Sequence, residues 1–230
     1  MSSLTTGSYF SLFYSIVCNM NILSIDTTRP SFTLSVFNNG DISTYIDKSK
    51  KVSSEIVLDE INNLVSNKNL KPNDINTVIY NNGPGSFTGV RVSSAIVQAI
   101  GFSNNCPVYG INSLMLDAFS YYKMKKIKNI QVIKKAFGDQ VFHGLLNLSE
   151  KQCLLDSDIS TSGLSDVTFD SEYTLLTDIE NITDDTKLNQ VFIESYIGSE
   201  LLIEFYERYS IKKKAFDYKD ALPSYAGHTI

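Results

Sequence analysis

The sequence contains no tryptophan, two histidines and three cysteines in 230 residues. The cysteines are odd in number and widely spaced, at Cys18, Cys106 and Cys153, with no C-x-x-C pair. This usage suits a reducing compartment and argues against a disulfide framework or a zinc site. Neither His143 nor His228 has a second histidine at helical spacing. We therefore expect no bound metal.

Long apolar runs and an excess of positive charge are also absent. No apolar run is long enough to span a bilayer. The apolar stretch Phe10–Cys18 has no Lys or Arg before it, which argues against a signal peptide. The net charge of -5 argues against a surface devoted to nucleic acid. We expect a cytoplasmic protein whose folded domain begins at Met20, with residues 1–19 as an extension or a misassigned start.

The apolar periodicity predicts an α/β fold in the first half of the chain. We expect strands over residues 22–25, 32–36, 42–46, 75–80 and 108–111, and helices over 53–66 and 89–102. An order βββαβαβ is characteristic of a mixed sheet with helices packed on it. The 43% hydrophobic content is enough to bury one large core or two modest ones.

Beyond Ser113 the pattern is less regular. We expect a helix over 114–125, strands near 129–133 and 140–148, a polar loop over 157–170, strands at 175–176 and 190–193, and a helix over 199–209. This organisation indicates two lobes. The first comprises residues 20–112 and 211–230, so the C-terminal tail returns to it, and the smaller second lobe comprises residues 113–210.

The segment Asn82–Arg91, N-G-P-G-S-F-T-G-V-R, connects a predicted strand to a predicted helix. It is neither a Walker A loop, which ends in Gly-Lys-Ser/Thr, nor the dinucleotide fingerprint, because its glycines are spaced G-x-G-x-x-x-G. Free amides at a helix start favour an anion. Two interpretations stay open. The loop is either a phosphate cradle, formed by Gly83, Gly85, Ser86, Thr88, Gly89 and Arg91, or a tight turn packed against a neighbour.

Asp26 and Thr27 follow the first strand and are the other candidates for chemistry. In a sugar-kinase-like or actin-like fold, an aspartate at this place holds a metal–nucleotide complex. That role needs a second acid and a second phosphate loop, which the sequence does not offer clearly. The alternative is that both residues satisfy backbone groups at a strand end.

The helix that follows the glycine loop is apolar or small nearly all round, which indicates cover on two sides. One side meets the sheet, and the other meets either a helix of this chain or a partner subunit. With the helix over 53–66 it could form half of an intersubunit bundle. The interface residues predicted in that case are Val92, Ala95, Ile96, Ala99, Leu58 and Ile61. A plainly buried helix is the alternative.

Six lysines form a local basic cluster: Lys123, Lys125, Lys126, Lys128, Lys134 and Lys135. Such a run is either a contact for RNA phosphates or a solvated face. No aromatic ladder interleaves with the lysines, so direct reading of bases is weakly supported.

Four motifs of this chain resemble the bacterial TsaB family, also called YeaZ. They are I-L-S-I-D-T-T (Ile22–Thr28), the glycine loop, V-Y-G-I-N-S-L (Val108–Leu114) and L-P-S-Y (Leu222–Tyr225). The order and spacing fit from about Met20 onward, and the second lobe matches in outline. The resemblance implies a two-lobed fold related to actin, Hsp70 and sugar kinases (ribonuclease H-like), with a degenerate nucleotide site.

The resemblance also implies a function. The family supports the synthesis of threonylcarbamoyladenosine beside the anticodon of tRNA. A TsaB-like protein is a non-catalytic scaffold that pairs with and activates the catalytic paralogue TsaD, joined by the ATPase TsaE, with TsaC upstream. The chain would meet tRNA through that complex and pair with itself when alone. No cofactor would bind firmly, and ATP, ADP or Mg would be held only within the complex.

Two rival functions stay open. The first is an active ATPase or kinase that uses Asp26 and the glycine loop, and the second is an RNA-binding module that uses the lysine cluster.

Two departures from the family pattern stand out. Lys135-Ala136-Phe137 replaces the Asp-Ala-Arg that often precedes the first hairpin of the second lobe, and Tyr225-Ala226-Gly227 replaces the Tyr-Leu-Arg of the tail. The resemblance therefore does not carry the role of that acid–arginine pair over to this chain, and the contact that the tail arginine would make is absent. Neither departure reaches the glycine loop or its helix.

Overall fold

The computed structural model describes residues 20–49, 52–180, 182, 190–192, 198–209, 215 and 217–224. The predictions for residues 1–19, for His228 and for Tyr225-Ala226-Gly227 lie outside these residues.

Five strands form the first sheet, in the order β3-β2-β1-β4-β5. They are β1 (Ile22–Asp26), β2 (Phe32–Asn38), β3 (Asp41–Asp47), β4 (Thr77–Gly83) and β5 (Val108–Asn112). The strands β1, β2 and β3 form an antiparallel meander, whereas β4 and β5 run parallel to β1. Asn39 and Gly40, both with positive φ, form the turn between β2 and β3. This is the mixed sheet predicted from the βββαβαβ order.

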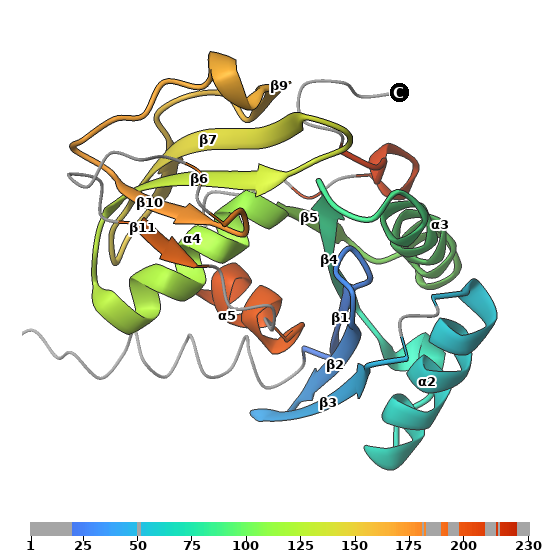
Figure 1. Cartoon of the computed structure of the whole chain (residues 1–230). Coiled ribbons are helices and arrows are strands. Elements are labelled where there is room, and N and C mark those ends of the chain that lie inside the picture. The colour runs from blue at the N-terminus through green and yellow to red at the C-terminus, as the bar shows by residue number, and fades with distance from the viewer. Residues whose placement is uncertain are drawn as a thin grey trace, which may run out of the picture.

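Helices α2 (Ser54–Asn67) and α3 (Phe87–Asn104) cover one face of this sheet (Figure 1). Because successive strand residues face opposite sides, Leu23 and Ile25 of β1 pack against these helices, while Ile22 and Asp26 face the other way. Each helix begins at a serine cap: Ser53 Oγ accepts from Ile56 N, and Ser86 Oγ accepts from Gly89 N.

The second sheet has the order β11-β10-β6-β7-β8, and β9 also pairs with β7. Its strands are β6 (Asn129–Lys135), β7 (Gln140–Leu148), β8 (Cys153–Leu155), β9 (Ser160–Gly163), β10 (Thr174–Thr177) and β11 (Gln190–Phe192). The prediction of a loop over residues 157–170 is wrong in part. Strand β9 lies within it, followed by a short 3-10 helix, Leu164–Asp166. Its residues, S-T-S-G, show no apolar alternation. The strand is half-buried and forms through backbone pairing with β7, which the side-chain pattern does not reveal.

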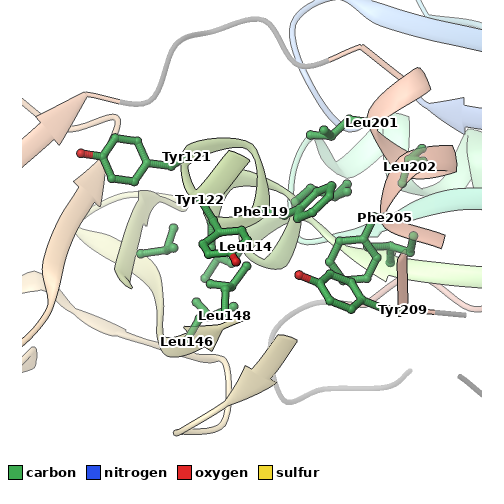
Figure 2. Close-up of a cluster of buried hydrophobic side chains, with 14 of the residues drawn as sticks. Leu114, Phe119, Tyr121, Tyr122, Leu146, Leu148, Leu201, Leu202, Phe205 and Tyr209 are labelled. Carbon is green, nitrogen blue, oxygen red and sulfur yellow. The ribbon is translucent and has the colours of Figure 1, made fainter. Parts of the chain in front are cut away.

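Two helices lie between the sheets, α4 (Ser113–Lys125) and α5 (Glu200–Tyr209) (Figure 1). Phe119 of α4 packs edge-on against Phe205 and Tyr209 of α5, with ring centroids 5.2 and 5.6 Å apart. Figure 2 shows these rings at the centre of a core that also contains Leu146 and Leu148 of the second sheet. The same core includes Ile22 and Ile79 of the first sheet, so both sheets share it. Helix α5, predicted as part of the second lobe, thus contacts both lobes.

The described part of the C-terminal tail lies against the first sheet and α3. Ser224 N donates to Asn82 O at 2.7 Å, and Gln98 Nε2 donates to Ala221 O at 3.2 Å. A 3-10 helix, Tyr218–Asp220 (η4), contacts α3, where the Tyr218 ring packs on Phe102 with centroids 5.3 Å apart. The tail therefore returns to the first lobe next to the glycine loop.

Among the described residues, no helix combines the length and the apolar character needed to cross a membrane.

Candidate functional site

Asp26 ends β1 with both of its carboxylate oxygens in use. Oδ1 accepts from Thr28 N at 2.9 Å and from Thr28 Oγ1 at 2.7 Å. Oδ2 accepts from Arg29 Nε at 3.1 Å and from Asn81 Nδ2 at 2.9 Å. A carboxylate offers about four lone-pair sites, so four donors fill it. A metal or a nucleotide could reach Asp26 only by displacing bonds within the chain.

Arg29 is the centre of the charged cluster at this strand end, although it is not among the residues predicted from the sequence. Its Nη1 lies 2.9 Å from Asp117 Oδ1, while its Nε contacts Asp26. On the far side of Asp117, Lys134 Nζ lies 2.7 Å from Oδ2. Asp26, Arg29, Asp117 and Lys134 thus form a chain of alternating charges with no net formal charge.

The electrostatics of this cluster favour the charged forms of its central pair. Burial by itself would lower the pKa of the Arg29 guanidinium, but Asp117 and Asp26 outweigh it and raise the pKa above its usual value. Burial would likewise raise the pKa of Asp117, yet Arg29 and Lys134 hold that pKa below its usual value. Both groups are therefore ionised at neutral pH.

The glycine loop packs directly on the segment that follows β1. A Cβ on Gly89 would lie 1.7 Å from Thr27 O, so only glycine fits this contact. Thr27 Oγ1 donates to Gly89 O at 2.6 Å and lies 3.0 Å from Ser93 Oγ. Gly85 lies against Thr28 in the same way. This close approach is the packing that the second interpretation of the loop requires.

Gly83 is constrained by its backbone and by the tail. Its φ is +99°, and a Cβ there would meet Ser224 O at 2.6 Å. Two loop amides donate within the chain: Gly83 N to Asn81 Oδ1 at 3.0 Å, and Ser86 N to Thr28 O at 2.8 Å. The glycine pattern is therefore explained by packing, without an anion.

Ser86 and Thr88 nevertheless line an open cleft of about 760 Å³ at the N-termini of α2 and α3, together with Thr28, Arg29, Ser53 and Ile56. Anion or nucleotide binding in this cleft stays a prediction.

Arg91 does not line this cleft, and its side chain packs on Phe87. Its guanidinium carbon lies 3.3 Å from the centroid of the Phe87 ring, and its Nη1 donates to Phe87 O. Within the described part of the chain, no three His, Cys, Asp or Glu side chains gather as a metal site.

The residues predicted to form a partner interface divide into two groups. Ala95 and Ala99 are exposed, Val92 is half-buried, and Leu58 is 43% exposed, so these side chains are available on the outer surface of α2 and α3. Ile61 and Ile96 are each 3% exposed and pack in the core between these helices and the sheet. For these two the prediction is wrong, because each lies on the helix face that meets the sheet. Phe102, 67% exposed, adds to the outer surface of α3.

The lysine cluster is not a single free surface. Lys134 belongs to the buried charge network, Lys123 pairs with Glu204 of α5, and Lys126 lies 3.5 Å from Glu150. Lys125, Lys128 and Lys135 are exposed.

Comparisons with known proteins agree with this architecture. A family model described as TsaD, tRNA N6-adenosine threonylcarbamoyltransferase, matches residues 47–133. The tRNA threonylcarbamoyladenosine biosynthesis protein TsaB of Buchnera aphidicola subsp. Schizaphis graminum is 32% identical over 123 residues, which cover 54% of this chain and 59% of that protein. The protein of the same name from Escherichia coli K12 is 29% identical over 96 residues, 42% of each chain. Over these segments the chain is similar in sequence to TsaB proteins.

The structural similarity extends over nearly the whole chain. The solved structure of YeaZ from Pseudomonas aeruginosa matches with a TM-score of 0.75 and 18% identity, covering 90% of this chain and 99% of that one. The fold is thus the two-lobed α/β architecture predicted from the TsaB resemblance. In sequence, by contrast, the chain spans about half of the length of the curated TsaB relatives that it matches.

Proposed function

We propose that this chain is a non-catalytic subunit in the synthesis of threonylcarbamoyladenosine on tRNA, which docks on a catalytic TsaD-type partner and activates it. The names of its TsaB relatives support the pathway. The observation that carries the non-catalytic role is the saturated Asp26 carboxylate, whose four lone-pair sites are filled by donors of the same chain. TsaE and tRNA would join through the complex.

The docking surface that we propose is the outer side of α2 and α3. Ala95 and Ala99 have small side chains, so a partner helix could approach the α3 backbone closely. Leu58 on α2 and Phe102 on α3 add exposed apolar area. A stable interface buries on the order of 1,600 Å² and is centred on apolar anchors. We define the docking surface by Leu58, Val92, Ala95, Ala99 and Phe102.

The test is co-elution with mass determination, using the chain and TsaD from the same cell, with and without TsaE and ATP. Leu58→Glu places a charge in the docking surface and should weaken the complex at least about 30-fold, equivalent to about 2 kcal/mol. Leu154→Glu is the matched control, because Leu154 is 45% exposed on β8, away from α2 and α3. It should bind like the parent.

Equal binding by both variants would show that the partner docks elsewhere. Absence of a complex under every condition would remove the proposed function itself.

An active ATPase or kinase of this fold is the alternative, and it predicts a different result. With Asp26 saturated, we expect no Mg-dependent release of phosphate from ATP by the isolated chain. Turnover that disappears in Asp26→Ala would contradict the proposal and favour the enzyme. A malachite-green assay on the purified chain and this variant measures it directly.

A further inference from the structure

We propose that Asp26, Arg29, Asp117 and Lys134 form an ionic latch that holds the two sheets in one arrangement at the C-terminal ends of β1 and β6. The latch goes beyond the proposed function and does not depend on it. It makes the relative position of the two lobes a property of the chain, independent of any ligand.

The four residues come from three separate layers of the fold. Asp26 ends β1 of the first sheet, and Arg29 lies in the connection to β2. Asp117 lies on α4, between the sheets, and Lys134 is near the end of β6 in the second sheet (Figure 1). The Arg29–Asp117 pair therefore ties the first sheet to α4, and the Lys134–Asp117 pair ties α4 to the second sheet.

The position of the latch complements the shared apolar core. Ile22, at the start of β1, belongs to the core between the sheets, whereas Asp26, at the other end of the strand, meets polar partners. Apolar contact is non-directional and tolerates sliding, while a guanidinium between two carboxylates requires a defined geometry. At this end of the strand the network thus adds contacts between the layers: a hydrogen bond from Lys134 Nζ to Asp117 Oδ2 at 2.7 Å, and an ion pair between Arg29 and Asp117 at 2.9 Å.

The network is buried and internally balanced. The side chains of Asp26, Arg29, Asp117 and Lys134 are 2%, 8%, 0% and 15% exposed. Buried ion pairs add little net stability compared with well-packed neutral residues, but removing one partner leaves a costly uncompensated charge. Their value then lies in specifying one arrangement. Neutral replacements of similar size should keep the fold and lose that specificity.

The experiment measures the distance between the lobes by pulsed dipolar spectroscopy. Nitroxides are attached to cysteines at Thr88, in the first turn of α3, and at Asp139, between β6 and β7, in a full chain whose native cysteines are replaced by alanine. Both sites are exposed. The test variant combines Asp117→Asn with Lys134→Met, which removes one charge of each sign and leaves the Asp26–Arg29 pair intact.

We expect the test variant to melt within a few degrees of the parent while its distance distribution broadens toward longer distances. The matched control combines Lys126→Met with Glu150→Gln at an ion pair whose side chains are 61% and 63% exposed, and it should leave the distribution unchanged. A test variant whose distribution superimposes on that of the parent would overturn the latch. Equal broadening in the control would also overturn it, because the effect would not depend on the buried network.

Discussion

At the scale of single residues, the main feature of the site is that the Asp26 carboxylate already accepts hydrogen bonds from donors of the same chain. Asp26 is the strand-end carboxylate that the sequence offers as a candidate for nucleotide binding, yet Thr28, Arg29 and Asn81 fill it. Arg29 in turn needs Asp117 to balance its charge. Arg29 therefore takes part in both sets of contacts, because its Nε contacts Asp26 and its Nη1 contacts Asp117.

A consequence at this scale is a defined dependence of stability on pH. Asp117 faces Arg29 and Lys134, with Asp26 beyond Arg29, and its pKa in the folded chain lies below the usual value of about 3.9. A depressed carboxyl pKa contributes stability that is present above the unfolded pKa and is lost as pH falls through the folded pKa. The free energy of unfolding should therefore decrease below about pH 4.

Urea unfolding of the parent and of Asp117→Asn at a series of pH values measures this contribution. The variant should be less stable at neutral pH and should lose less stability on acidification. Parallel pH profiles for the two chains would show that Asp117 makes no such contribution.

At the scale of elements, the sequence predicts strands and helices well where apolar residues form a short run or recur with the period of a strand or a helix. Strands β1 to β5 and helices α2 to α4 lie within a few residues of their predicted ranges, because each carries one of these two patterns. Strand β9 escapes prediction because S-T-S-G carries no apolar period. Ile96 lies on α3, which is apolar nearly all round, so no polar stripe marks its outer face. Ile61 lies on α2, where Val57, Leu64 and Val65 are buried with it on the face toward the sheet.

The charge network escapes prediction for a different reason. Asp117 is a single acid in an apolar helix, and Arg29 follows two threonines in a turn. Nothing local distinguishes them from surface residues. The contact between them exists only once β1, α4 and β6 are brought together, so it requires tertiary structure to be seen.

The C-terminal η4 helix should stabilise the end of α3. The Tyr218 ring packs on Phe102, and Gly101 leaves room for it, since a Cβ there would meet Tyr218 Cβ at 2.8 Å. Tyr218→Ala should therefore increase amide hydrogen exchange in the last turns of α3, with little change in α2. Mass-spectrometric exchange measures both helices in one experiment. Equal deprotection of α2 and α3 would contradict a local role, and no change in either would show that the tail contributes nothing to α3.

At the scale of the whole molecule, two sheets share one apolar core. Phe119, fully buried and packed against Phe205 and Tyr209, lies in that core with residues of both sheets (Figure 2). Neither sheet can therefore unfold without exposing apolar surface of the other. We expect the two lobes to unfold as one cooperative unit.

Calorimetry of the parent and of Phe119→Leu and Phe119→Ala tests this cooperativity. Phe119→Ala should cost about 3–5 kcal/mol, and the milder Phe119→Leu should cost less. The transition should stay single in each folded variant. Two separable transitions would show that the lobes are energetically independent, contrary to the shared core.

The contact between Gly89 and Thr27 has a genetic consequence. Every missense change at the Gly89 codon adds at least one carbon atom, in a place where that atom would lie 1.7 Å from a backbone oxygen. In a saturation mutagenesis screen scored by growth, the position should tolerate almost nothing, as a catalytic residue would. Measuring protein abundance alongside growth separates the two cases, because loss at Gly89 would follow from loss of folded protein.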